Sequence, residues 1–142
     1  MKLQTASSVI SFARKLEEEG VKYYQQLAES YPRNREIFGG FANDNRKFIV
    51  QTERAYYGVI SDALEGCFAF DIDPDMYAIE TACAEDKSYT YDRDKAIEIE
   101  EVTARFYADA AEQSQSLMAD VPRTFSIIAN KRSSRIANLK SL

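Results

Sequence analysis

Two glutamates in a repeated segment are the residues best placed to do chemistry. The first copy, Leu16–Tyr24, reads LEEEGVKYY, and the second, Ile99–Tyr107, reads IEEVTARFY and lies 83 positions later. This displacement places Glu17 over Glu100 and Tyr24 over Tyr107. Each copy lies within an amphipathic helical pattern, so the two glutamates are candidate site residues at matching positions of two predicted helices.

Composition limits what such a site could be. The 142 residues include no His, which is the commonest transition-metal ligand and the usual acid-base group near neutral pH. Cys67 and Cys83 lie 16 positions apart with no CxxC pair, which argues against a zinc knuckle or a redox dithiol. We expect buried thiols in a reducing compartment, with a disulfide as the alternative.

Helical periodicity indicates the elements that position these side chains. Apolar residues recur at spacings of three and four, which predicts helices over residues 5–30, 33–65, 91–118 and 121–140. We therefore expect one all-α domain over residues 1–142, an antiparallel four-helix bundle. Glu17, Asn45 and Glu100 lie on the apolar stripes of the first three helices. The expected stripe of the third is Ile97, Glu100, Ala104, Tyr107, Ala111, Ser114 and Leu117.

The last helix carries arginine on its core-facing stripe. This stripe contains Phe125, Ile128, Arg132, Arg135 and Leu139. A guanidinium facing a core must be paired or reach water, so an anionic group is expected opposite the two arginines.

The repeat also extends to the second and fourth helices. Their matching residues, offset by 87 positions, are Phe38, Phe41, Ala42 and Asn43 against Phe125, Ile128, Ala129 and Asn130. The sequence therefore predicts two helical hairpins joined by a long crossover, Cys67 to Tyr89.

With these features the chain resembles the ferritin-like superfamily, and its Glu-Glu-x-Gly-x-x-Tyr-Tyr segment is most similar to short rubrerythrin-type members. The resemblance implies a di-iron or other di-metal centre that handles oxygen or peroxide, with one Glu from each of helices one and three and Glu-x-x-His from each of helices two and four. Glu17 and Glu100 match the single glutamates. The Glu-x-x-His positions fall on Asn45 and Phe48 in helix two and on Arg132 and Arg135 in helix four.

These departures predict that the di-metal site has been lost. Two carboxylates alone hold a hard cation only with much water, and two guanidiniums beside them would oppose any metal. We expect no catalytic residue and no cofactor, and a non-catalytic dimerising or partner-binding module. The alternative is a residual oxidoreductase or metal-binding protein that holds iron or manganese with Glu17, Glu100 and unaligned carboxylates such as Asp44 or Asp109.

In place of the metal, the sequence predicts a buried network of Glu17, Asn45, Glu100, Arg132 and Arg135. Glu100 should pair with Arg132 or Arg135, because helices three and four form one hairpin. In the alternative, the arginine side chains extend to the bundle end and leave the glutamates with tyrosine hydroxyls or water.

Charge and hydropathy set the expected partners. The net charge is −5, yet residues 121–142 carry five cations and no acid. We expect this basic helix to pack on glutamate-rich helices of its own bundle rather than on nucleic acid. No stretch reaches the length of a membrane span or of a signal peptide, so a cytoplasmic protein is expected.

Surplus aromatic residues on helix two, including Tyr56 and Tyr57, suggest a homodimer through helices one and two.

Overall fold

The structure is a computed structural model that describes residues 2–59, 70–81, 88–115 and 120–142. Within these ranges the chain forms four long α-helices and no β-strand, which confirms the all-α class. The helices are α1 (Ala6–Ser30), α2 (Arg35–Val59), α4 (Tyr89–Gln113) and α5 (Asp120–Lys140), with short 3₁₀ helices η1 (Pro32–Asn34) and η2 (Pro74–Tyr77).

Local sequence explains where the helices begin. Thr5 and Ser8 form a capping box at the start of α1, because each side-chain oxygen accepts a hydrogen bond from the other residue's backbone N–H, at 3.2 and 3.3 Å. Ser88 caps α4 by accepting from the Tyr91 N–H at 3.1 Å, so α4 begins two residues before its predicted start. Pro32 begins η1 rather than α2, which starts at Arg35 instead of position 33.

Two of the predicted helix ends agree with the structure and one does not. The first and last helices end at Ser30 and Lys140 as expected. The third was expected to reach residue 118, but α4 ends at Gln113, and residues 114 and 115 form a turn. Residues 116–118 and 60–65, where the other predicted ends fall, lie outside the described residues, as do Cys67 and Cys83.

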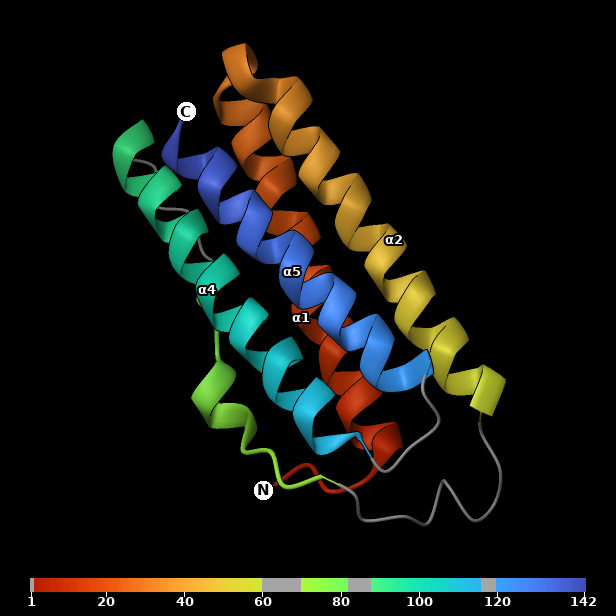
Figure 1. Cartoon of the computed structure of the whole chain (residues 1–142). Helices are drawn as coiled ribbons and strands as arrows, with labels where there is room; N and C mark the ends of the chain where they lie inside the picture. The colour runs from red at the N-terminus through yellow and green to blue at the C-terminus, as the bar shows by residue number, and fades with distance from the viewer. Residues whose placement is uncertain (1, 60–69, 82–87, 116–119) are drawn as a thin grey trace.

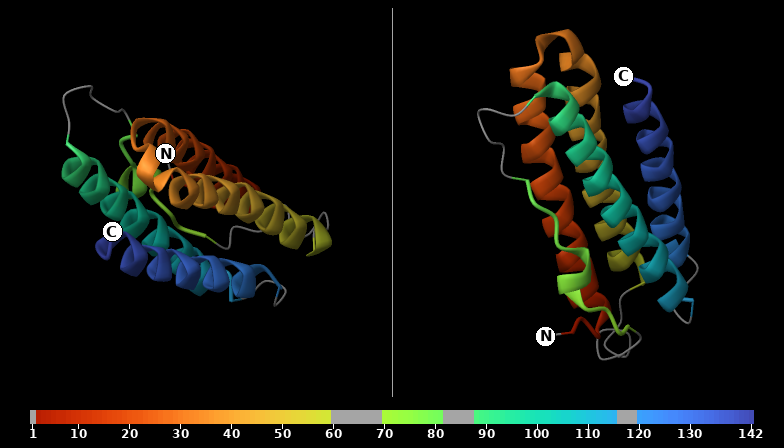
Figure 2. Two further views of the ribbon diagram at one scale, coloured as in Figure 1. Left: turned by 90° about the horizontal axis from the view of Figure 1, so that it is seen from above. Right: turned by 90° about the vertical axis from the view of Figure 1, so that its left-hand side faces the viewer.

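The helices form a bundle of two antiparallel hairpins (Figure 1). α1 packs on α2, α4 packs on α5, and α2 also packs along α5. α4 begins at the end of the bundle opposite to the one where α2 finishes, so α1 and α5 run one way while α2 and α4 run the other (Figures 1 and 2). Helices adjacent in the bundle are therefore antiparallel.

Residues 70–81 lie along α1 and α4. An antiparallel β-bridge joins Leu3 to Ile72. The Tyr77 hydroxyl donates to the Asp109 carboxylate, and Arg105 donates to the Met76 carbonyl at 2.8 Å. Residues 70–81, which belong to the connection between the hairpins, therefore form hydrogen bonds with both hairpins.

The buried apolar side chains form two clusters along the bundle. One contains Leu16, Phe48, Tyr107 and Ile128 among others, and the second is built around residues such as Tyr24. The polar side chains predicted to face inward lie on the same helices, between residues of the two clusters. This places a polar layer within a largely apolar core.

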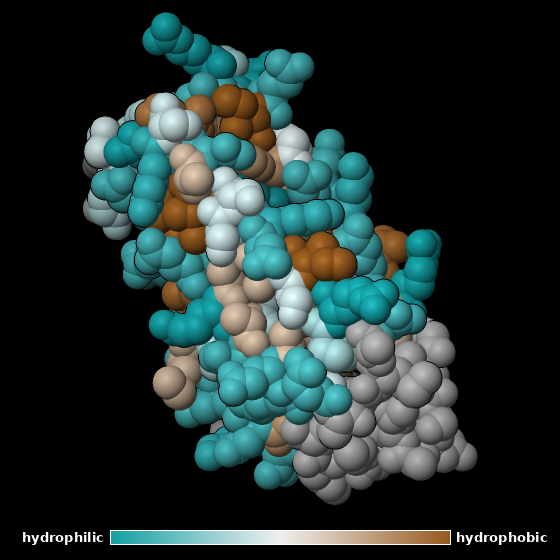
Figure 3. Space-filling view, in the orientation of Figure 1, coloured by the Kyte–Doolittle hydropathy of each residue, from teal (hydrophilic) through white to brown (hydrophobic). Residues whose placement is uncertain are grey.

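One face of the molecule is largely hydrophilic among the described residues. Teal side chains cover most of the face shown in Figure 3, with apolar atoms visible between α5 and α2. Among the described residues, none of the helices is both long and apolar enough to cross a membrane.

Candidate functional site: a buried glutamate–arginine network

Charged side chains from three helices meet in the polar layer with an amide from the fourth. Glu17 of α1 and Glu100 of α4 are completely buried, and Arg132 and Arg135 of α5 are only 1% and 4% exposed. Asn45 of α2 is also completely buried. The alternative in which the arginines extend to the bundle end is therefore wrong, and the predicted network is present.

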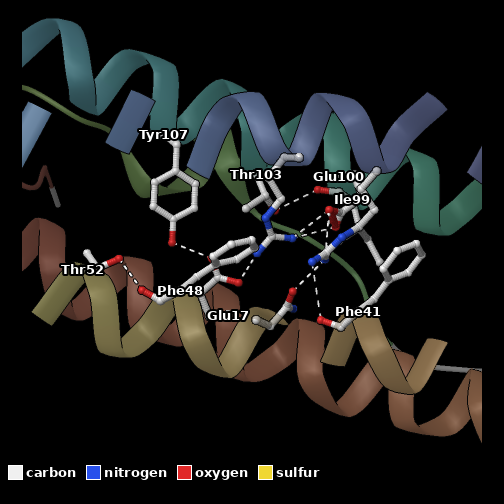
Figure 4. Close-up of polar contacts among 11 residues, drawn as sticks. Glu17, Phe41, Phe48, Thr52, Ile99, Glu100, Thr103 and Tyr107 are labelled. Carbon is white, nitrogen blue, oxygen red and sulfur yellow. Dashed lines mark hydrogen bonds and ion pairs between the residues drawn. The ribbon is translucent and has the colours of Figure 1, made fainter. Parts of the chain in front are cut away.

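Arg132 bridges the two glutamates (Figure 4). Its Nη1 donates to both carboxylate oxygens of Glu100, at 2.9 and 2.7 Å, and its Nη2 donates to Oε1 of Glu17. The carboxylates of α1 and α4 thus share one guanidinium. Hydrogen bonds between ionised groups are the stronger class, and the planar guanidinium fork suits this double pairing.

Arg135 extends the network to α2. Its Nη1 donates to Oδ1 of Asn45 at 2.7 Å and lies 3.2 Å from Oε1 of Glu100. Aromatic rings surround the guanidinium, whose carbon lies 4.7 Å from the ring centre of Phe41, 5.5 Å from that of Tyr24 and 5.6 Å from that of Phe48. Cation–π interactions at these distances stabilise the charge of Arg135, which is removed from water.

The repeated tyrosines flank the network but differ in their contacts. The Tyr107 hydroxyl donates to Oε2 of Glu17 at 2.6 Å (Figure 4). The Tyr24 hydroxyl lies in the field of Glu100 and forms no hydrogen bond of standard geometry with any described residue. Tyr107 therefore orients Glu17, whereas Tyr24 contributes its ring to the surroundings of Arg135.

Gly20 belongs to the site, although its motif position alone did not show its role. A Cβ atom at Gly20 would lie 2.5 Å from Nδ2 of Asn45, which is closer than side-chain carbons approach nitrogen. The Asn45 amide therefore packs directly on the backbone of α1. Glycine at this position allows Asn45 to turn its Oδ1 toward Arg135.

Burial and mutual charge determine the protonation of the network. Burial raises the pKa of Glu17, while Arg132 and the Tyr107 hydroxyl oppose that rise. Burial opposes the charge on Arg132, but the Glu100 and Glu17 carboxylates outweigh it and raise the pKa of Arg132. Burial, reinforced by the Glu17 carboxylate, raises the pKa of Tyr107 well above its ordinary value.

The residues of this layer do not fit a di-metal centre. Two guanidiniums balance two carboxylates, so the layer carries no net charge, and Arg132 occupies the space between the glutamates where a cation would need to bind. Within the described ranges, no three acidic or cysteine side chains gather as a metal-binding group. Asp109 pairs with Tyr77 instead, and Asp44 lies beside a surface groove, so neither completes a ligand set with Glu17 and Glu100.

The structure brings together all the predicted network residues on one layer. Phe48 lies beside them and contributes an aromatic ring rather than a polar ligand. The centre of this ring lies 5.2 Å from the Arg132 guanidinium carbon. Comparison of the chain with protein-family models, curated proteins and solved structures gives no match.

Proposed function

We propose that the chain is a ferritin-like bundle in which arginine side chains have replaced a di-metal centre, and that it serves as a non-catalytic module that dimerises or binds a partner protein. One observation carries the proposal: Arg132 donates to Glu17 and Glu100 at once. The guanidiniums supply the positive charge that the two glutamates would otherwise take from metal ions.

The arrangement of the helices supports the ferritin-like assignment. The two hairpins, with α2 and α4 parallel, require a connection that crosses the length of the bundle, as in ferritin-like folds (Figure 1). Glu17 and Glu100, which match the single metal-binding glutamates, meet between α1 and α4. Arg132 and Arg135 come from α5, at the Glu-x-x-His positions that the resemblance implies for helix four.

The contacts of the network support a role other than catalysis. Its glutamates are completely buried, and each is already paired with a guanidinium. A carboxylate that acts as acid, base or ligand needs access to its substrate or ion, whereas these carboxylates hold three helices together.

Exposed apolar side chains on α2 support the dimer. Val50 and Tyr57 are 52% and 64% exposed and lie seven positions apart, on one helix face. We propose a homodimer through α1 and α2. Light scattering at high protein concentration should give the dimer mass, and replacing Val50 and Tyr57 with serine should give the monomer mass. A monomer mass for the unchanged protein would contradict the dimer.

An iron-oxidation assay separates this function from the alternative oxidoreductase. Ferrous iron added to the protein in air should be oxidised no faster than in buffer, because Arg132 blocks the space between the glutamates. The control is Glu17→Gln, which should leave the rate unchanged. Faster oxidation that Glu17→Gln abolishes would favour the residual iron enzyme.

A further inference from the structure

A groove between α2 and α5 leads from the surface to the buried network. It encloses about 310 Å³ and is lined by Phe41, Asp44, Lys47 and Phe48 of α2 and by Lys131 and Arg135 of α5, among others. Figure 3 shows apolar atoms in this region between hydrophilic side chains of the two helices. The groove combines aromatic walls with charged groups.

The charge of this groove is opposite in sign to that of the whole chain. Lys47 and Lys131 line it against one acid, Asp44, although the chain carries a net charge of −5, and the Arg135 guanidinium beside them is balanced within the network. The Lys131 ammonium lies 5.9 Å from the ring centre of Phe48, so it projects over the aromatic wall. A groove lined by one sign of charge attracts ligands of the other sign.

Arg135 offers the groove an incompletely used donor. Its Nη1 is occupied by Asn45 and Glu100, but among the described residues its Nη2 donates only to the Phe41 carbonyl, at the long distance of 3.5 Å. A guanidinium carries five N–H donors in a fixed plane. A carboxylate in the groove could accept from Nη2 without breaking the pairs inside the network.

We propose that this groove binds a small organic acid with a flat apolar body. Its carboxylate would lie between the Lys47 and Lys131 ammonium groups and Nη2 of Arg135, and its body would pack on the rings of Phe41 and Phe48. The volume is at the lower end of small-molecule sites, which suits a ligand the size of benzoate. The site is separate from the proposed loss of metal and does not depend on it.

Titration of the ¹⁵N-labelled protein with benzoate, followed by amide chemical shifts, tests the site. Benzoate should saturate shifts in residues 41–51 and 131–138 with a dissociation constant on the order of 1 mM. Acetate lacks the apolar body and benzyl alcohol lacks the charge, so each should bind at least about tenfold more weakly. No saturable shifts with benzoate, equal binding of all three probes, or shifts elsewhere on the bundle would overturn the proposal.

Charge-matched variants separate the groove from the general field of the protein. Lys131→Gln and Lys47→Gln should each weaken benzoate binding about fivefold, and Asp44→Asn should strengthen it. Lys22 is an exposed lysine of α1 that does not line the groove, so Lys22→Gln makes the same charge change and should leave affinity nearly unchanged. Equal losses in the groove variants and the Lys22 control would contradict a defined site.

Discussion

Replacing Glu17 and Arg132 separately and together tests the network most sharply. These two form the appropriate pair, because Glu100 contacts both arginines and would still pair with Arg135, at 3.2 Å, after both replacements. Arg132→Met leaves Glu17 with only the Tyr107 hydroxyl, and Glu17→Leu leaves two guanidiniums sharing one carboxylate. Each single change creates a net buried charge and should cost about 3 to 5 kcal/mol of unfolding free energy.

The double variant removes one charge of each sign and keeps the layer neutral. It should therefore cost about 0 to 2 kcal/mol, which implies a coupling energy of at least about 3 kcal/mol between the two sites. Urea denaturation followed by circular dichroism measures all three variants. A single variant that fails to fold while the double variant folds would also support coupling. Additive losses would refute the network as the structural unit of this layer.

Three further predictions follow from particular contacts. Gly20→Ala should displace Asn45 and lower the free energy of unfolding, measured by urea denaturation, by about 1 to 3 kcal/mol. The control is Gly39→Ala, whose new Cβ would meet no atom within 4 Å and which should be neutral or stabilising. Equal effects of the two changes would contradict the close packing at Gly20. Tyr107→Phe should cost about 1.5 to 3 kcal/mol by removing a hydrogen bond to a charged group, and no loss in thermal denaturation would count against it. Tyr24, Tyr77 and Tyr107 all have raised pKa values, and that of Tyr77 reaches about 12. The stability that their neutral forms contribute should therefore be full below pH 10 and fall as the pH rises through the raised pKa values. An ultraviolet titration of the folded protein in which all nine tyrosines ionise together near pH 10 would refute this.

The sequence was most informative where periodicity and residue type agreed. Glu17, Arg132 and Arg135 stood out because charged residues on apolar stripes must find partners. Glu100 was expected to pair with one of the arginines because the third and fourth helices form one hairpin. The basic last helix was expected to pack on acidic helices of the bundle, and this is confirmed for the two arginines.

The third helix shows where pattern reasoning failed. Ile97 and Ala104 were expected on the buried stripe, but both are partly exposed, whereas Ala96, Ile99 and Thr103 are buried. The buried face of α4 contains alanine, threonine and glutamate, so hydrophobicity gives a weak signal of its direction. The close approach of Asn45 to Gly20 could not be predicted, because periodicity indicates which face of a helix is buried but not which side chain of the neighbouring helix lies against each position.

Elemental analysis of anaerobically purified protein tests the central proposal, that guanidiniums have taken the place of metal ions. After incubation with ferrous iron or manganese and removal of free metal, the protein should hold less than one metal ion per chain. Two ions per chain, together with loss of that binding in Glu17→Gln, would contradict the replacement of the metal centre by arginine.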